Sequence, residues 1–210
     1  MSEVLRDLVV SLSLDGDNFS RNLTSINKQI QEAESEFKRA ASGVDNFEKS
    51  VKGTQAQLSS LQQKLSLQQK AVTQYQRALE AANKKLENVY TRQGKLSDAL
   101  DQAKQKNAAL ESQVAAATRQ YEQYARTLGE SDSTTIAAKA NLDALSEEYA
   151  QSSAEVKKLE GQLAANAKTL QNNADAVTKA RTNLNNAQGA LRQTEAQIKS
   201  ATERLARMEW

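Results

Sequence analysis

The chain has 210 residues, of which 39% are hydrophobic but only 4% aromatic, and its 28 basic and 26 acidic side chains leave a net charge of +2. This composition holds too few bulky apolar residues for an ordinary globular core, and the evenly mixed charges argue against a nucleic-acid interface, which needs clustered basic residues. Histidine and cysteine are both absent, which removes the usual zinc ligands, thiol nucleophiles and histidine acid–base catalysts.

The first segment, residues 1–17, has the pattern of a short β-strand followed by a turn. Every second residue from Leu8 to Leu14 is apolar, which is the period of a half-buried strand. Asp15-Gly16-Asp17 supplies turn residues, and Asp17 or Asn18 can cap a helix that follows. A lone strand needs a partner, so we expect it to pair with another copy or to dock on another protein. A frayed terminus is the alternative.

From Leu23 onward, apolar residues recur at every seventh position to the end of the chain. With Leu23 as position a, 24 of the 27 a positions are apolar or tyrosine, and the exceptions are Gln93, Asn107 and Thr135. Position d starts at Ile26 and is apolar or tyrosine at 20 of 27 places, many of them alanine. The phase never slips and no proline interrupts it, which is typical of a left-handed coiled coil. We therefore predict an all-α protein built on one long heptad-patterned coiled-coil helix.

Three places weaken a single continuous helix. They are Ser42-Gly43 with Asp45-Asn46 nearby, Lys52-Gly53-Thr54, and the stretch from Leu128 to Thr135, where Gly129 can end one helix and a Ser or Asp can cap the next. Leu128 and Leu142 are nevertheless two whole heptads apart, which favours a weakly packed stretch of continuous helix. A helical hairpin or bundle folded near Gly129 is the alternative, because heptads also pattern antiparallel bundles.

The predicted organisation is therefore a strand and turn at 1–17, a first coiled-coil segment at 18–128, a possible hinge at 129–135 and a second coiled-coil segment at 136–210. One helix with a single apolar stripe cannot bury that stripe alone, so we predict self-association through the heptad seam, with a slight preference for a trimer. The predicted oligomer core consists of strongly apolar a and d residues: Leu58, Leu61, Leu65, Val72, Leu79, Leu86, Leu96, Leu100, Leu110, Val114, Leu142, Leu145, Val156, Leu159, Leu163, Leu170, Val177, Leu184, Leu191, Ile198 and Leu205.

Polar residues also stand in the seam, among them Gln68, Gln93, Asn107, Asn166 and Asn173. Such residues weaken a coiled coil, but they penalise wrong registers and orientations. The seam should therefore be marginal at any one point and stable only in sum.

Nothing in the sequence predicts catalysis. The seven glycines are dispersed and form no phosphate-binding loop. Paired carboxylates such as Glu147-Glu148 are expected on an exposed helix face, with no pocket to tune them. No run approaches the ~18 apolar residues of a membrane span, and the apolar stretch from Val4 to Leu14 is too interrupted by charges for a signal peptide. We predict no enzyme, cofactor, metal or specific nucleic acid, and no membrane contact from this segment.

Several stretches resemble the N-terminal region of tape measure proteins of long-tailed bacteriophages and prophages. They are the opening R-D-L-V-V-S-L-S-L-D-G-D-N-F-S-R-N-L, then I-N-K-Q-I-Q-E-A-E-S-E-F-K-R-A-A-S-G-V, and the heptads around L-S-S-L-Q-Q-K-L. The resemblance extends over essentially the whole chain, and its specific part is the first 45 residues or so. Any long coiled coil resembles the remainder.

The resemblance implies a structural ruler. A tape measure protein lies extended along the tail during assembly, and its length sets how many tube rings polymerise. It would bind tail tube, tail chaperone and baseplate or initiator proteins, first in the host cytoplasm and then inside the virion tail. The apolar, membrane-active or lytic segments of longer family members have no counterpart here. A cellular coiled-coil adaptor or tethering protein is the competing hypothesis.

Overall fold

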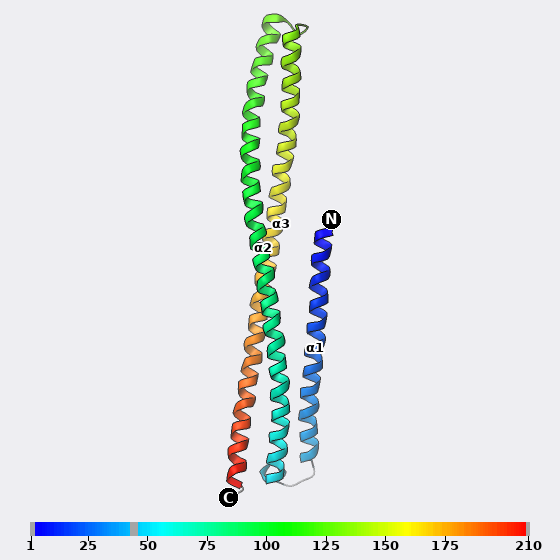
Figure 1. The fold of residues 1–210 in the computed structure, drawn as a ribbon, viewed down its shortest axis with the longest axis vertical. Helices are drawn as coiled ribbons and strands as arrows, with labels where there is room; N and C mark the ends of the chain where they lie inside the picture. Colours follow the sequence, from blue (N-terminus) through cyan, green and yellow to red (C-terminus); the bar gives the residue numbers. More distant parts are fainter. Residues whose placement is uncertain (1–2, 43–45, 209–210) are drawn as a thin grey trace. The chain divides into compact units, whose positions relative to one another are not determined.

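The computed structural model describes residues 3–42 and 46–208, with side chains from Phe19 onward except that of Glu48. Its elements are α1 (Glu3–Ala41), the short 3-10 helix η1 (Phe47–Lys49), α2 (Val51–Leu128) and α3 (Ser133–Met208) (Figure 1). Helices account for nearly all of these residues and strands for none, so the prediction of an all-α protein is confirmed. The chain divides into unit 1, residues 1–84 and 175–210, and unit 2, residues 85–174.

The structure has a helix where the N-terminal strand was predicted. Residues 8–14 and the expected turn at Asp15-Gly16-Asp17 all lie within α1. The sequence pattern fits both structures, because Leu5, Leu8, Val9 and Leu12 are spaced i, i+3, i+4 and i+7. A helix pairs its backbone groups internally, whereas a strand needs a neighbouring strand. The described residues contain no strand that could be that neighbour.

Unit 2 is an antiparallel helical hairpin, made from the second half of α2 and the first half of α3 (Figure 1). The favoured expectation of a continuous helix is therefore wrong, and the hairpin folded near Gly129 is what the structure contains. Gly129 ends α2 with a φ of 87°, a left-handed conformation that glycine adopts without strain. Asp132 then caps α3, because its carboxylate accepts a hydrogen bond of 2.8 Å from the Thr134 N–H.

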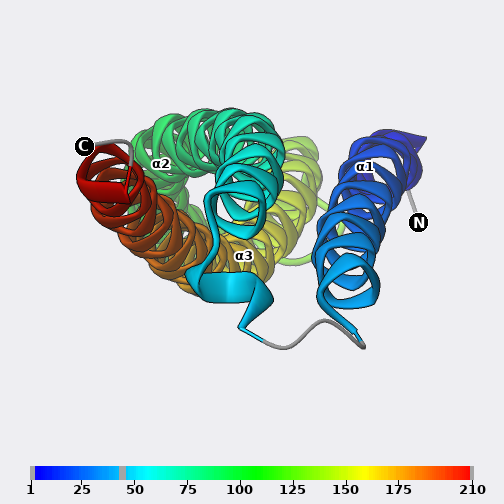
Figure 2. The same ribbon diagram turned by 90° about the horizontal axis from the view of Figure 1, so that it is seen from below.

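Unit 1 contains α1, η1, the start of α2 and the end of α3. The start of α2 lies between α1 and the end of α3 (Figures 1 and 2). Lys64 on α2 pairs with Glu34 on α1, and Phe19 meets Tyr75 edge to face with ring centroids 5.5 Å apart. On the other side of α2, Arg204 on α3 donates a hydrogen bond of 3.0 Å to the Gln57 side chain.

A tight joint is formed where η1 meets the first turn of α2. The Ser50 hydroxyl donates to the Phe47 carbonyl over 2.7 Å and accepts from the Gly53 N–H over 3.0 Å, which caps the first turn of α2. A Cβ on Gly53 would lie 1.7 Å from the Phe47 carbonyl oxygen. Only glycine therefore fits there. Of the two weak points expected in this part of the chain, Lys52-Gly53-Thr54 lies within the first turn of α2, and Gly43 and Asp45 of the other lie outside the described residues.

The heptad positions carry the packing in both units. Sixteen non-glycine residues of the described chain are buried, and all except Ala71 occupy a or d. The buried set includes Leu100, Leu110 and Leu159, but also polar residues such as Thr54 and Thr194. The seam is thus thin and partly polar, as the alanine-rich and amide-rich a and d columns predicted.

Candidate interaction surfaces

The helix faces of this chain offer contacts with other helices. Within residues 19–42 and 46–208, no group of three or more His, Cys, Asp or Glu side chains could hold a metal ion. Glu148, one of the paired carboxylates noted above, forms an ion pair of 3.2 Å with Lys106, and both side chains are at least half exposed. Exposed pairs of this kind contribute ~0–1 kcal/mol. None of the described helices has an apolar stretch long enough to cross a bilayer.

The seam of unit 2 is fixed by polar pairs that cross between α2 and α3. The Asn166 amide donates hydrogen bonds to the Gln93 side chain over 2.7 Å and to the Val89 carbonyl over 3.3 Å. The Ser153 hydroxyl donates to the Asn107 side chain over 2.9 Å. A shift of one helix along the other would break both sets and leave the buried Asn166 amide without a partner, so these pairs specify the register.

Salt bridges at the edge of the same seam repeat this register. Lys104 and Glu160 approach to 3.0 Å, and their side chains are about half exposed. Lys106 and Glu148 form the second such bridge. These exposed charges add little stability, but they disfavour arrangements in which like charges would meet.

All 21 residues of the predicted oligomer core are partly or fully buried, and none is exposed. Five of them are among the most buried side chains: Val72, Leu100, Leu110, Leu159 and Val177. All of them lie on α2 or α3, and these two helices pair with each other within one chain. Their role in an oligomer therefore stays a prediction.

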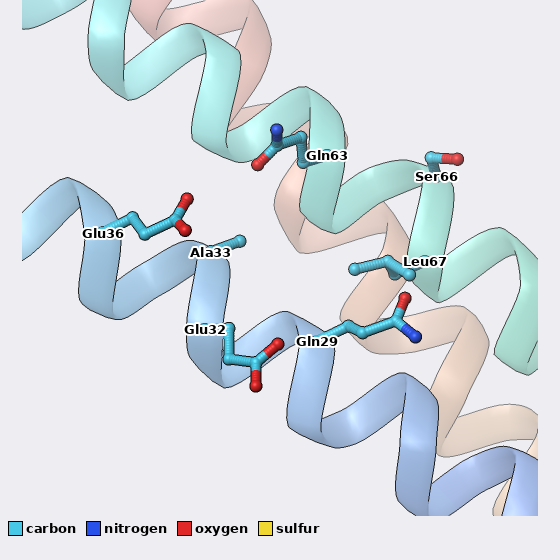
Figure 3. A pocket seen from close by; sticks show the side chains of 7 residues that line it. All are labelled: Gln29, Glu32, Ala33, Glu36, Gln63, Ser66 and Leu67. Atoms are coloured by element: carbon cyan, nitrogen blue, oxygen red, sulfur yellow. The ribbon is translucent and has the colours of Figure 1, made fainter.

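Unit 1 has a groove between α1 and α2 with a volume of about 360 Å³. Gln29, Glu32, Ala33 and Glu36 line it from α1, and Gln63, Ser66 and Leu67 line it from α2. Figure 3 shows the Ala33 methyl group and the Gln29 side chain directed toward α2, with Gln63 and Leu67 on the facing helix. Beside this groove, the Ser60 hydroxyl donates to the Ala33 carbonyl over 3.1 Å and ties the two helices together.

A second groove in unit 1, of about 260 Å³, is lined by all three helices. Its lining residues are Asn27 and Ile30 from α1, Gln68, Ala71 and Tyr75 from α2, and Asn183, Asn186, Ala187 and Ala190 from α3. Gln68 is 9% exposed, and its side-chain oxygen accepts no hydrogen bond from the described residues. An amide oxygen buried in this way is destabilising.

The turn of the hairpin carries two exposed apolar residues of unit 2. Leu128 is 51% exposed and Ile136 is 57% exposed. A groove of about 370 Å³ beside them is lined by Tyr121, Thr135, Ile136 and Lys139 among others, and the Lys139 ammonium lies 5.8 Å from the Tyr121 ring centroid.

The Asp132 carboxylate at this turn has a lowered pKa. The main cause is the hydrogen bond from the Thr134 N–H, and the second is the hydrogen bond from the Thr134 side chain.

Two functional features of the structure were not predicted from the sequence. One is the contact of Phe47, Ser50 and Gly53 at the joint, for which the only sequence signal is a serine three residues before a glycine. The other is the pairing of Gln93 with Asn166. Both stood out as polar seam residues, and the reversal near residue 130 brings them together in this structure. No family model matches this chain, and no curated protein and no solved structure shows significant similarity to it.

Proposed function

We propose that this chain is a structural segment of a bacteriophage tail tape measure protein, which acts as a ruler and scaffold during tail assembly. The observation that carries the proposal is the single heptad phase from Leu23 to Met208, on helices with no proline. A ruler needs a fixed rise per residue, and an α-helix supplies about 1.5 Å per residue and about 10 Å per heptad. The resemblance of the first 45 residues to tape measure proteins supplies the biological role.

The proposal assigns partners to the helix faces outside the seam. Tail tube, tail chaperone and baseplate or initiator proteins would bind these mixed-charge faces, first in the host cytoplasm and then inside the tail. A neighbouring set of tube and chaperone genes, and co-purification of those proteins with the full-length product, would support this assignment. A gene neighbourhood without tail genes would count against it.

A deletion of facing heptads tests the ruler directly in the full-length gene product. Removing residues 96–102 from α2 and 157–163 from α3 keeps the seam in phase, because these segments face each other across it. Tails should shorten by about 10 Å if the hairpin is kept along the tail, or by about 20 Å if the segment is straight. Electron micrographs of the tails give the measurement, and unchanged tail lengths would reject the ruler.

The matched control removes six residues from each helix, 96–101 and 158–163. This deletion is nearly the same size but breaks the heptad phase, so the seam is lost on one side of each cut. We expect a failure of tail assembly here, in contrast to the shortened tails of the seven-residue deletion. Normal tails from the six-residue deletion would show that the seam has no part in assembly.

A cellular adaptor or tethering protein is the second candidate, favoured by the exposed apolar turn. Leu128 and Ile136 place a small apolar surface at the end of the hairpin, and such a surface suits a docking contact. Ile136→Asp should then abolish partner capture while leaving the helical content of the chain unchanged. If the chain is a ruler, the same substitution leaves the tail length unchanged.

A further inference from the structure

The hairpin register has a symmetry that bears on self-association. Asn107 lies 23 residues before Glu130 and its partner Ser153 lies 23 residues after it. Gln93 lies 37 residues before Glu130 and Asn166 lies 36 residues after it. Within unit 1, Gln57 and Arg204 lie 73 before and 74 after the same residue. All these pairs are thus centred on the turn.

The heptad phase continues through the turn without a shift. Leu128 and Thr135 are consecutive a positions, and Ser131 between them is a d position. If residues 129–132 became helical, α2 and α3 would form one helix with one continuous seam. Two such helices, antiparallel and centred on Glu130, would place Asn107 of one copy beside Ser153 of the other, and would repeat every seam contact of the hairpin between copies.

We propose that the hairpin opens at residues 129–132 and exchanges its α3 with a second copy of this chain, giving a twofold antiparallel dimer with the same seam contacts. The trimer expected from the sequence has no such correspondence with the observed pairs. The exchange does not rest on the proposed function. A straightened segment would, however, give the ruler its greater length.

The turn opposes the exchange through local features, the positive φ of Gly129 and the Asp132 cap, and not through tertiary packing at Gly129. Only the positive φ favours glycine at position 129, because a Cβ placed there would meet no atom within 4 Å. Glu130, Ser131 and Asp132 are residues that a helix accepts. Leu128, at an a position, is 51% exposed beside the turn. It would enter the seam of the dimer and lie near Ser131 of the second copy.

Concentration decides between the two forms in the wild-type chain. A short turn holds the two arms at an effective concentration on the order of 1 mM. We therefore expect the chain to be a monomeric hairpin at about 20 µM and to exchange into dimers when it is refolded at about 1 mM.

Gly129→Ala is the decisive variant. Alanine is disfavoured at the positive φ of the turn and favoured in a helix, so each turn shifts toward the straight form by about 30-fold or more. A dimer straightens two turns, and its dissociation constant should fall about a thousandfold. Light scattering should then show a dimer at about 20 µM. A chain that stays monomeric up to about 1 mM would overturn the proposal.

The matched control is Gly161→Ala, a helical glycine with equally open surroundings. It improves helix propensity in the hairpin and in the dimer alike, so the monomer–dimer equilibrium should be unchanged. A second variant inserts two glycines between Glu130 and Ser131. The longer loop is tolerated by the hairpin, but it breaks the heptad phase of the straight helix, so this variant should stay monomeric at about 1 mM. Dimers from it with exchanged arms would contradict the inference.

Cross-linking shows whether a dimer is formed by exchange. A zero-length carbodiimide cross-linker should join Lys104 to Glu160, which approach to 3.0 Å. With an equal mixture of ¹⁴N-labelled and ¹⁵N-labelled chains, unfolded together and refolded, the hairpin gives only unmixed cross-linked peptides. An exchanged dimer gives about half mixed peptides. A Gly129→Ala dimer with only unmixed peptides associates by another surface and would also overturn the proposal.

Discussion

Both units bury polar residues in the heptad seam, and these residues differ in whether the opposite helix supplies a hydrogen-bond partner. In unit 2, Asn166 donates to Gln93 and Ser153 donates to Asn107, so these four residues have partners on the other helix. The buried Gln68 oxygen in unit 1 and the buried Thr135 hydroxyl in unit 2 have no hydrogen-bond partner among the described residues. A polar seam residue therefore specifies the register only where the opposite helix supplies a partner, and elsewhere it only weakens the packing.

The glycines at the two junctions are required for different reasons. Gly53 in unit 1 is required because the Phe47 backbone occupies the place of its Cβ, whereas Gly129 in unit 2 is required only by its positive φ. The first junction is fixed by its tertiary contact and the second by local conformation alone. The joint between α1 and α2 should therefore resist change much more strongly than the turn between α2 and α3.

Gly53→Ala should have the largest effect among single substitutions. The added methyl group would overlap the Phe47 carbonyl, and backbone rather than a flexible side chain must move. We expect a loss of about 3 kcal/mol in the free energy of unfolding of unit 1. Amide hydrogen exchange should locate the loss in α1 and the first turns of α2, and leave residues 85–174 unchanged.

Gly189→Ala is the control for Gly53→Ala, because it lies on α3 in unit 1 and a Cβ added there would meet no atom within 4 Å. Its higher helix propensity should stabilise unit 1 by up to ~1 kcal/mol. If both substitutions gave the same small gain, the close contact at the joint would be absent in solution.

Asn166→Ala should destabilise unit 2 by about 2 kcal/mol, because Gln93 and the Val89 carbonyl lose their donor. Replacing both amides, with Gln93→Leu and Asn166→Leu together, should restore most of that stability, since no polar group is then left unpaired. Urea unfolding followed by circular dichroism gives both values. A double variant less stable than Asn166→Ala would show that the pair is stabilising in itself.

Gln68→Leu should have a smaller effect of the opposite sign. It removes a buried amide oxygen that no described residue satisfies, and we expect a gain of about 1 kcal/mol in the stability of unit 1. The contrast with Asn166→Ala is the test of the comparison between paired and unpaired polar residues of the seam. A loss of stability from Gln68→Leu would mean that this amide is satisfied in solution.

The sequence was sufficient to predict where residues are buried, but not which helix they face. The a and d columns identified Leu100, Leu110 and Leu159 as core residues, because heptad periodicity depends only on local spacing. The reversal at Gly129 was the less favoured prediction, since the phase is the same for a hairpin and a straight helix. Which form is stable depends on the turn and on the protein concentration, and the heptad spacing gives information about neither.

The N-terminal segment shows a second limit of periodicity. Apolar residues in the first 14 positions satisfy both the twofold alternation of a strand and the spacing of a helix, so composition and pattern together did not decide between them. The pairing of Gln93 with Asn166 was hidden for a different reason. It depends on a register between distant segments, and a single sequence does not contain that register.

The cap of α3 gives the smallest expected effect and a test of how the turn is held. The hydrogen bond from the Thr134 N–H, the largest cause, and that from the Thr134 side chain lower the pKa of Asp132 below its ordinary value of 3.8. A carboxyl group with a lowered pKa in the folded state stabilises the fold above the ordinary value, and this stability is lost as the pH falls through the folded pKa. Asp132→Asn keeps a capping side chain but removes the charge. Thermal unfolding of the two chains should therefore differ less at pH 2 than at pH 5, because only the wild-type cap titrates. Equal differences at both pH values would show that the Asp132 carboxylate does not hold the turn, and the opening of the hairpin would then be governed by Gly129 alone.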